Sequence, residues 1–343
     1  MKTIFQCAGR GSALLSMLLS TALSAQIQTY QNHPETVSFI NEMVSEHNFA
    51  QADLQKLFAG AERKQSILDA IARPAEKTLA WKEYRQIFLK PDRIDKGADF
   101  WQANHAVLAQ AKQEFGVPEE IIVAIIGVET RYGENKGSYR VLDALATLGF
   151  DYPPRASFFR KELMHFLLLS REQGQDPSVL LGSYAGAMGY GQFMPSSFRS
   201  YAVDFDGDKL ADIWNNPTDA IGSVANYLAR HGWRRDQTIT VRARVQNDYN
   251  ANLINQSLDV DQSIEQLQAA GIEPVTPLEA NIEAMAMKLD GENGAEFWLG
   301  LKNFSVITRY NRSRLYAMAV TQLADNIEQS YRRRAEPSSG PQS

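Results

Sequence analysis

Glu129 is the residue whose place in the sequence most directly suggests chemistry. It ends an apolar run, Ile121 to Val128, within the stretch PEEIIVAIIGVETRYG. A carboxyl group at the boundary between a buried segment and a cleft is partly desolvated, and desolvation raises its pKa. A carboxyl group that is still protonated near neutral pH can act as a general acid and protonate a glycosidic oxygen as the bond breaks. The alternative is a surface glutamate paired with Arg131 or Lys136.

A second group of charged side chains lies in the stretch DFDGDKLADIWNNPTD. Asp204, Asp206 and Asp208 occupy positions one, three and five, as in the first half of an EF-hand loop, where alternate oxygen atoms converge on calcium. The second half differs, because Lys209 replaces the usual glycine and Asn215 stands where a glutamate normally closes the loop. The pattern predicts a calcium site of unusual spacing, and the alternative is a solvated acidic turn. The five histidines are scattered and do not have the spacing of a zinc site.

The segment that carries Glu129 is predicted to be a helix. Pro118 is suited to a helix start, and Glu119 and Glu120 place acids in the first turn, where they complement the helix dipole. A buried strand is the less favoured alternative for this β-branched run. The preceding residues 26–115 also show three- and four-residue spacing and are predicted to form a helical region. Its aromatic and apolar side chains are predicted to face a core, among them Trp81, Tyr84, Ile87 and Phe88.

The pattern changes after Trp233. The stretch QTITVRARV alternates with a period of two, and the stretch EAMAMKLDGENGAEFWLGLKNFSVITRY predicts two or three strands with a turn at residues 290–294. We therefore expect a small β subdomain at 236–309, a helix at 310–331 that closes the chain, and a disordered tail at 332–343. The predicted fold class is α+β and mainly α, with a catalytic core at 116–235 that includes the acidic loop.

The first residues have the features of an export signal. Lys2 and Arg10 precede an apolar stretch of about a dozen residues, which is shorter than the roughly 20 needed to span a bilayer. Cleavage after Ala25 would remove residues 1–25 and with them Cys7, the only cysteine, leaving no thiol for a lipid or a disulfide. The sequence thus predicts a periplasmic protein, with an uncleaved membrane anchor as the alternative.

Composition narrows the range of partners. The chain has 343 residues, which is enough for about two domains, and 44% of them are hydrophobic. Without residues 1–25 it carries 33 basic and 40 acidic residues, and Arg332 to Arg334 is the only basic run. Nucleic acid is therefore not an expected partner.

Two separated motifs, GVETRYG and SYAGAMGYGQFMPSSF, together with ITRYN near the C-terminus, resemble the lytic murein transglycosylases. The similarity is greatest to the membrane-bound lytic murein transglycosylase B type, which has a lysozyme-like catalytic domain, and it extends from about residue 81 to residue 320. It implies that Glu129 is the single catalytic acid and base. The implied reaction cleaves the β-1,4 bond between N-acetylmuramic acid and N-acetylglucosamine in peptidoglycan and leaves a 1,6-anhydromuramic acid end.

The resemblance also implies further site residues. Glycines at 186, 189 and 191 permit tight turns and a close approach of the backbone to a sugar. Asp219 would supply a late carboxylate to the calcium site and Leu210 a backbone carbonyl. Ser183 and Gln192 could instead be a helix cap and a loop residue, and Tyr227 a core tyrosine. The substrate-binding residues implied by the motifs are Ser183, Gln192, Tyr227, Tyr310, Asn311 and Arg155.

The resemblance leaves two other functions open. One is a hydrolytic muramidase of the lysozyme type, and the other is a peptidoglycan-binding scaffold without activity. No organic cofactor is expected, and calcium would have a structural role. The expected partners are peptidoglycan strands and, beyond them, proteins of cell-wall synthesis, with a monomer favoured. Members of the family that carry a lipid have a cysteine after the signal, which this chain lacks.

Overall fold

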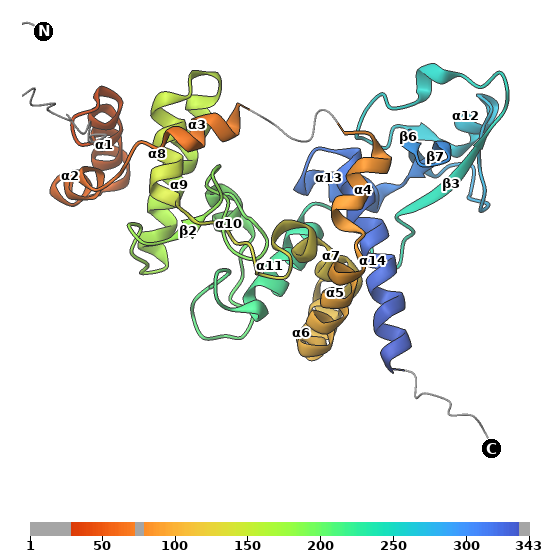
Figure 1. Ribbon diagram of the computed structural model, residues 1–343, viewed down its shortest axis with the longest axis horizontal. Helices are drawn as coiled ribbons and strands as arrows, with labels where there is room; N and C mark the ends of the chain where they lie inside the picture. Colours follow the sequence, from red (N-terminus) through yellow and green to blue (C-terminus); the bar gives the residue numbers. More distant parts are fainter. Residues whose placement is uncertain (1–28, 73–78, 336–343) are drawn as a thin grey trace, which may run out of the picture.

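The computed structural model describes residues 29–72 and 79–335 (Figure 1). The molecule is elongated, with the first helices at one end and a five-stranded sheet at the other, and most of the elements between them are helices. The prediction of a mainly helical α+β fold is confirmed. The predicted signal at 1–25 and Cys7 lie outside the described residues.

The chain begins with six helices that precede the Glu129 segment. They are α1 (Pro34–His47), α2 (Gln51–Ala59), α3 (Gln65–Ile71), α4 (Trp81–Phe88), α5 (Pro91–Ala103) and α6 (His105–Phe115). The first three lie in the left half of Figure 1, and the next three lie right of its centre beside α7 and α14, so this helical region is divided between two parts of the molecule.

One predicted core residue among these helices is exposed. Trp81 and Tyr84 are buried and Phe88 packs against the core, but the side chain of Ile87 is 42% exposed. Ile87 comes six residues after Trp81, and at 3.6 residues per turn this places it about 120° around α4 from the buried face. The prediction that Ile87 faces the core was therefore wrong.

Helix α7 (Glu119–Thr130) is the central element of the fold. Every residue from Ile121 to Gly127 is buried, so the helix is apolar on all sides. Helices α5, α6 and α11 (Pro217–Arg230) pack against it, as does α14 (Arg314–Ala335) from the far end of the chain. The backbone N–H of Arg131, in the left-handed conformation, bonds to the last turn and ends the helix. The helix prediction for this run is confirmed.

The middle of the chain forms a second helical group with a small β element. It comprises β1 (Tyr139–Arg140), α8 (Val141–Asp151), α9 (Ala156–Glu172), β2 (Leu181–Gly182) and α10 (Pro195–Tyr201). Strands β1 and β2 pair antiparallel, and isolated bridges link Gly182 to Met188 and Met188 to Phe193. These pairings fold residues 182–193 into a compact loop.

The predicted strands after residue 236 form an antiparallel sheet in the order β4-β6-β7-β3-β5. The strands are β3 (Thr240–Val245), β4 (Gln262–Ser263), β5 (Ile272–Pro274), β6 (Glu283–Gly291) and β7 (Gly294–Gly300), and α12 (Ile264–Ala269) lies between β4 and β5. The hairpin of β6 and β7 turns where Gly291 pairs with Gly294, as the sequence predicts.

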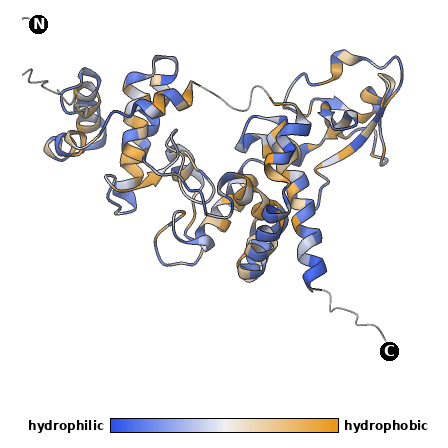
Figure 2. Ribbon diagram, viewed as in Figure 1, coloured by the Kyte–Doolittle hydropathy of each residue, from blue (hydrophilic) through white to orange (hydrophobic). Residues whose placement is uncertain are grey.

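Strand β6 joins this sheet to the helical body. Because alternate side chains of a strand point to opposite faces, Ala284 and Ala286 pack into a small core of the sheet, while Met285 and Met287 pack into the main core. Figure 2 shows hydrophobic and hydrophilic residues alternating along the helices and strands of the molecule.

The chain ends with α13 (Lys302–Tyr310) and α14, and α14 packs along α5 and α7. The prediction that residues 302–310 belong to the strands of the β subdomain was wrong, because they form a helix whose residues 303–308 are buried. The last helix begins at Arg314 and continues to Ala335, whereas the sequence predicted a helix at 310–331 and a tail from 332. Tyr331 stacks on Trp101 of α5 with ring centroids 4.5 Å apart, and Arg334 bonds to Asp95 at 2.8 Å, so α5 supports four more residues of the helix. The rest of the predicted tail, 336–343, lies outside the described residues.

Candidate active site

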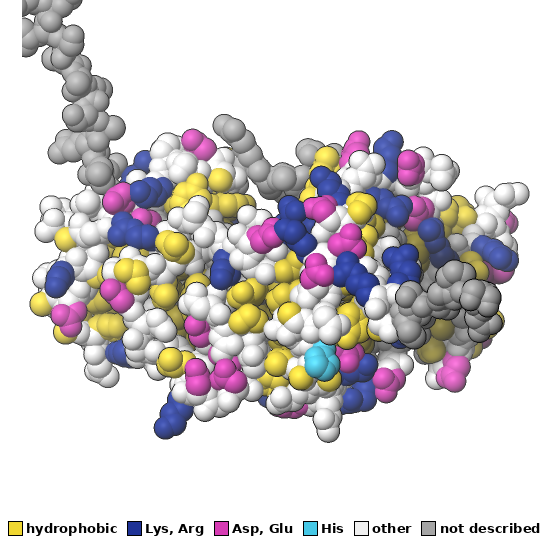
Figure 3. Space-filling model, turned by 60° about the horizontal axis from the view of Figure 1, so that its bottom comes forward, with side chains coloured by type: hydrophobic (Ala, Val, Ile, Leu, Met, Phe, Trp, Pro, Cys, Tyr) yellow, Lys and Arg dark blue, Asp and Glu magenta, His cyan; other side chains and the backbone are white. Residues whose placement is uncertain are grey.

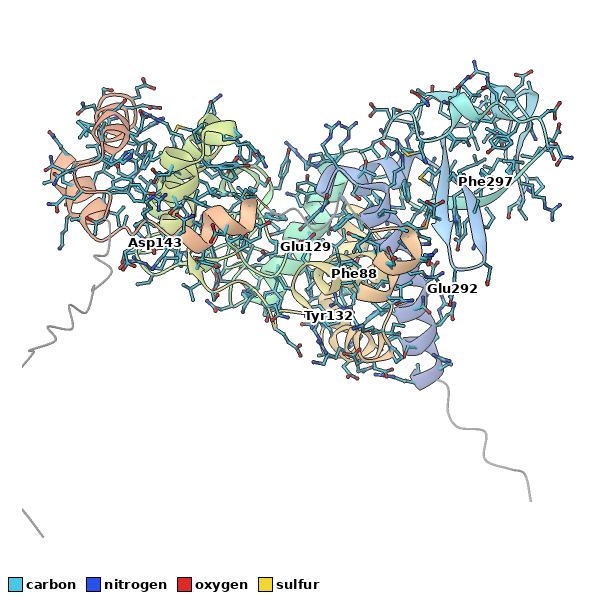
Figure 4. All side chains as sticks on the ribbon, turned by 45° about the horizontal axis from the view of Figure 1, so that its top comes forward. Phe88, Glu129, Tyr132, Asp143, Glu292 and Phe297 are labelled. Atoms are coloured by element: carbon cyan, nitrogen blue, oxygen red, sulfur yellow. The ribbon has the colours of Figure 1, made fainter. Side chains whose placement is uncertain are left out.

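The carboxyl group of Glu129 lies at the C-terminal end of α7 and is half-buried. Its Oε1 accepts a hydrogen bond of 2.6 Å from the hydroxyl of Tyr316, in the first turn of α14. The next residue, Thr130, fixes the end of the helix, because its hydroxyl donates to the carbonyl oxygen of Tyr190 at 2.9 Å. Glu129 is therefore held between the last helix and the loop of residues 182–193, near the middle of the molecule (Figure 4).

Tyr316 was not predicted as a site residue. Its side chain is 2% exposed, and burial, followed by the negative charge of Glu129, raises its pKa well above the usual range. The hydroxyl therefore stays protonated throughout the ordinary pH range and can donate to the Glu129 carboxyl group. This hydrogen bond stabilises the ionised form of Glu129, whereas the desolvation considered from the sequence stabilises the neutral form.

The loop of residues 182–193 forms one side of the site. Gly186 and Gly189 have φ values of +81° and +69°, as tight turns require. A Cβ atom at Gly191 would meet the hydroxyl of Tyr310 at 2.7 Å, and this hydroxyl donates to the Gly191 carbonyl oxygen at 2.6 Å. The predicted turns are therefore present. The close approach at Gly191 is made by a protein side chain, whereas the sequence analysis expected a sugar there.

Ser183 and Gln192 lie at the two ends of this loop. The Ser183 hydroxyl accepts hydrogen bonds from the backbone N–H groups of Ala185 at 3.3 Å and Ala187 at 3.1 Å. Gln192 has a positive φ of 50°, and its side-chain amide donates to the carbonyl oxygen atoms of Gly189 and Lys136 at 3.0 and 3.3 Å. Both side chains therefore stabilise the loop itself.

Tyr227 and Tyr310 belong to an aromatic cluster behind the loop. Their ring centroids are 4.7 Å apart, and Phe193 lies about 6 Å from both. The Tyr227 hydroxyl donates to the Arg309 carbonyl oxygen at 2.7 Å, and burial raises its pKa to about 12. The cluster packs α13 against α11 and thereby places the start of α14 over Glu129.

The remaining predicted binding residues occupy different surroundings. Asn311 directly follows α13 and is half-buried, between Tyr310 and the first turn of α14. Arg155 is exposed before α9, where its guanidinium lies over the rings of Phe158 and Phe159 at 4.5 and 5.1 Å. The contacts described for Arg155 are to this aromatic pair and do not join it to the Glu129 cluster.

The acidic loop brings four carboxyl groups together. One oxygen atom from each of Asp204, Asp206, Asp208 and Asp219 lies within 4.8 Å of the others. The first three side chains are exposed, and Asp219 is fully buried in the first turn of α11. Burial raises the pKa of Asp219, although the N–H groups of Phe205 and Asp212 oppose this by donating to it at 2.8 Å. Four convergent carboxylate oxygen atoms are the donor set that calcium prefers.

Comparison with known proteins decides the family. Residues 31–325 match the family described as the Transglycosylase SLT domain. The chain belongs to the lytic transglycosylase family. It is similar to membrane-bound lytic murein transglycosylase B of Escherichia coli K12, with 45% identity over 307 residues that cover 87% of this chain and 84% of the relative. The predicted enzyme class, a peptidoglycan lytic transglycosylase, is confirmed.

Solved structures of lytic transglycosylases have the same fold. The X-ray structure of Pseudomonas aeruginosa SltB1 shares 54% identity and superimposes with a TM-score of 0.86, covering 88% of this chain and 99% of that chain. The Escherichia coli enzyme Slt35, in complex with calcium, gives 46% identity, a TM-score of 0.81, and coverage of 88% and 94%. Pseudomonas aeruginosa SltB3, in complex with NAG-anhNAM-pentapeptide, gives 30% identity, a TM-score of 0.78, and coverage of 88% and 80%.

These neighbours confirm the lysozyme-like fold of this transglycosylase. In the part of the chain that the structure describes, no helix is both long enough and apolar enough to cross a bilayer. Figure 3 shows a face on which basic and acidic side chains are interspersed with small hydrophobic areas.

Proposed function

We propose that this transglycosylase cleaves the β-1,4 bond between N-acetylmuramic acid and N-acetylglucosamine and leaves a 1,6-anhydromuramic acid end, with Glu129 as the only acid and base. The observation that carries the proposal is the place of Glu129 at the end of a buried helix, where a buried tyrosine hydroxyl donates to its Oε1 at 2.6 Å. A carboxyl group held in this way can change between its two protonation states without moving.

The reaction needs one proton donor and one proton acceptor in succession. Protonated Glu129 gives its proton to the glycosidic oxygen as the bond from that oxygen to C1 of the muramyl residue breaks. The carboxylate then removes the proton of the C6 hydroxyl, whose oxygen attacks C1 and closes the anhydro ring. Glu129 regains its proton and no water is consumed. Because the nucleophile belongs to the substrate, its effective concentration is high and a second catalytic carboxylate is not required.

Asp143 and Asp151 are the first two aspartates after Glu129 in the sequence, and their surroundings support this proposal. Asp143 is 1% exposed, receives two hydrogen bonds from Arg140 at 2.8 and 2.9 Å, and lies well apart from Glu129 in Figure 4. Asp151 pairs with Arg63 at 3.4 Å and accepts a hydrogen bond from Tyr30. Both carboxylates have structural partners, and so does Glu134, which pairs with Arg131 at 3.0 Å and with Lys96. These pairings support a reaction in which Glu129 acts alone.

We further infer that the loop of residues 182–193 and the end of α13 bind the sugar rings beside Glu129. Ser183, Gln192, Tyr310 and Asn311 belong to these segments, and Tyr227 supports Tyr310 from behind. Arg155 is proposed to bind a more distant part of the strand. SltB3 has been solved with NAG-anhNAM-pentapeptide, which is the kind of product this proposal requires.

Calcium is the proposed ion of the acidic loop. Asp204, Asp206, Asp208 and Asp219 would hold it through carboxylate oxygen atoms, and we expect the Leu210 carbonyl oxygen to join them. Bound calcium, with its charge of +2, would offset part of the repulsion among four converging carboxylates and so fix the start of α11, the helix that carries Tyr227. Slt35, a structural neighbour, was solved in complex with calcium.

The proposed site of action is the periplasm, after loss of residues 1–25, on peptidoglycan strands and alongside proteins of cell-wall synthesis. The support is the sequence of the first 25 residues and the cell-wall substrate of the family. Intact-mass measurement on cell fractions tests it. A chain beginning near Gln26 in the periplasmic fraction agrees with the proposal, and a full-length chain in the membrane fraction contradicts it.

Mass spectrometry of digested sacculi tests the proposed reaction. The anhydro ends formed without water are lighter by one water than the reducing ends formed by hydrolysis. We expect anhydro ends from the wild type, and far fewer from Glu129→Gln in the same digestion time. Reducing ends would identify a hydrolytic muramidase, and an inactive wild type that still binds sacculi would identify a scaffold protein.

A further inference from the structure

A pocket of about 410 Å³ lies where β6, the segment 254–258 and the connection between α13 and α14 meet. Three of its lining residues are cationic, Lys288, Arg312 and Arg314, and none of its lining residues is acidic. Leu258, Leu289 and Leu315 supply an apolar lining. We call it the cationic pocket.

Asn255 holds the segment 254–258 against β6. Its φ of 59° is unusual for a residue other than glycine. In this conformation its side chain accepts from the N–H of Lys288 at 3.2 Å and donates to the Lys288 carbonyl oxygen at 3.0 Å, while its own N–H donates to Ala286 at 2.9 Å. These three hydrogen bonds fix the backbone from which the Lys288 side chain projects into solvent.

Arg314 connects the same segment to the last helix. One guanidinium nitrogen donates to the carbonyl oxygen atoms of Asn255 and Ser257 at 2.7 and 2.9 Å. Burial lowers the pKa of Arg314, but its charge remains because the ordinary pKa of arginine is so high. The pocket is thus built from three segments that are bonded to one another, and it does not depend on a flexible loop.

The positive charge of the pocket that is not already paired belongs to two exposed side chains at its edge. Lys288 and Arg312 are exposed, and within the described residues neither forms a salt bridge. The nearby acid Asp259 is paired with Arg309 at 2.7 Å. Helix α14 has no acid in its first turn, so the partial positive charge of its N-terminus is added to that of the side chains. The pocket therefore favours an anion that also has small apolar groups.

The pocket lies beside the proposed reaction centre. Leu315 lines the pocket and Tyr316, the next residue, donates to Glu129. Consecutive residues of a helix project about 100° apart, so the two side chains leave different sides of the same turn. An extended peptide of five residues spans about 17 Å, which is more than the roughly 10–12 Å diameter of a helix with its side chains, so it is long enough to reach from one side of the turn to the other.

We propose that the cationic pocket binds the carboxylate-bearing peptide attached to the muramyl residue of the substrate. The inference rests on the proposed function, because it places the muramyl ring next to Glu129. The peptides of peptidoglycan carry free carboxylates and small aliphatic side chains, which match the charge of Lys288 and Arg312 and the apolar lining. The pocket would then make the enzyme prefer strands that retain their peptides over strands that have lost them.

The test compares two substrates: glycan strands with intact peptides, and the same strands after an amidase has removed the peptides. We expect wild-type kcat/KM to be higher on the peptide-bearing strands. The double variant Lys288→Gln with Arg312→Gln should lower this value about three- to tenfold, because exposed ion pairs are individually weak. Its kcat/KM on the bare strands should be unchanged. Wild-type preference should also fall when the peptide carboxylates are converted to methyl esters.

A matched double variant, Arg244→Gln with Arg333→Gln, removes two exposed cations that lie away from the pocket. It should keep the wild-type preference, as should Lys288→Arg with Arg312→Lys, which retains both charges. Equal losses on both substrates, a wild type without preference, or the same loss in the matched variant would overturn the proposal. Absence of anhydro products from both substrates would instead refute the proposed function, so the two failures are distinguishable.

Discussion

Replacing Tyr316 by phenylalanine removes a buried hydroxyl that donates a hydrogen bond to Glu129. The Tyr316 ring is 2% exposed and phenylalanine keeps it, so the substitution opens no large cavity. The lost hydrogen bond is 2.6 Å long and involves a charged acceptor, and such bonds contribute about 1.5–3 kcal/mol. At 1.36 kcal/mol for each factor of ten, a bond required in the transition state would change kcat by roughly 10- to 150-fold.

The measurement is the rate of anhydro-product formation from purified sacculi, as a function of pH and substrate concentration. We expect kcat to fall at least tenfold in Tyr316→Phe. Because the hydroxyl stabilises the ionised carboxylate, we also expect the alkaline limb of the kcat/KM profile to move to higher pH. A purely structural role would change neither the profile nor kcat in the folded protein.

The control for this experiment is Tyr132→Phe. Tyr132 is another tyrosine whose hydroxyl donates a hydrogen bond, in this case to the backbone carbonyl oxygen of Arg93 at 2.8 Å. Burial raises the pKa of Tyr132 above its ordinary value, as it does for Tyr316. This variant should lose a similar amount of stability, on the order of 1 kcal/mol, while its pH profile is unchanged. The reasoning would be refuted if Tyr316→Phe kept wild-type kcat, or if both variants lost activity in proportion to their loss of stability.

Three other predictions follow from the same structure. Glu129→Gln should lower turnover by about 10²- to 10⁴-fold and still bind sacculi in a sedimentation assay, and retention of a tenth of the activity would exclude Glu129 as the acid. Calcium at about 100 times its Kd should stabilise the protein by roughly 2.7 kcal/mol. The Tm should therefore rise when calcium is added, and this rise should be absent in Asp206→Ala. An equal Tm in chelator and in calcium would contradict the prediction. Burial, with Glu328 and Glu119 adding to it, raises the pKa of Glu120, so ionisation of Glu120 destabilises the folded protein as pH rises through that pKa. Denaturant unfolding should therefore show that Glu120→Gln is more stable than the wild type by up to about 1 kcal/mol at pH 7 and equally stable below about pH 4. The control is Glu119→Gln, which loses the 2.7 Å salt bridge to Lys112 and should not be more stable than the wild type.

The parts of the fold that the sequence predicted are those determined by local patterns. Pro118 and the two acids after it indicate a helix start, and the continuous apolar run indicates that the helix is buried, which together predict α7 and place Glu129 at its end. The period of two in residues 237–245 predicts β3, and the spacing of three aspartates predicts the acidic cluster. Each of these patterns is contained within about twenty residues.

The parts that the sequence did not predict depend on distant contacts. Tyr316 is an ordinary apolar position in a helical pattern, and only the packing of α14 on α7 brings its hydroxyl to Glu129. Gly191 is small because Tyr310 approaches it from 119 residues away. The extension of α14 past residue 331 likewise depends on Trp101 and Asp95 of α5, since its arginine-rich end has no apolar period of its own.

These distant contacts explain why the reaction centre needs nearly the whole chain. Glu129 and Tyr316 are separated by 187 residues, and the sheet of β3 to β7 lies between them in the sequence. The sheet is joined to the helical body by Met285 and Met287, and α13 then returns the chain to the loop of residues 182–193 through Tyr310. The β subdomain thus determines where α14 begins, and the start of α14 supplies both the partner of Glu129 and the wall of the cationic pocket. In the proposed reaction its role is to position these groups.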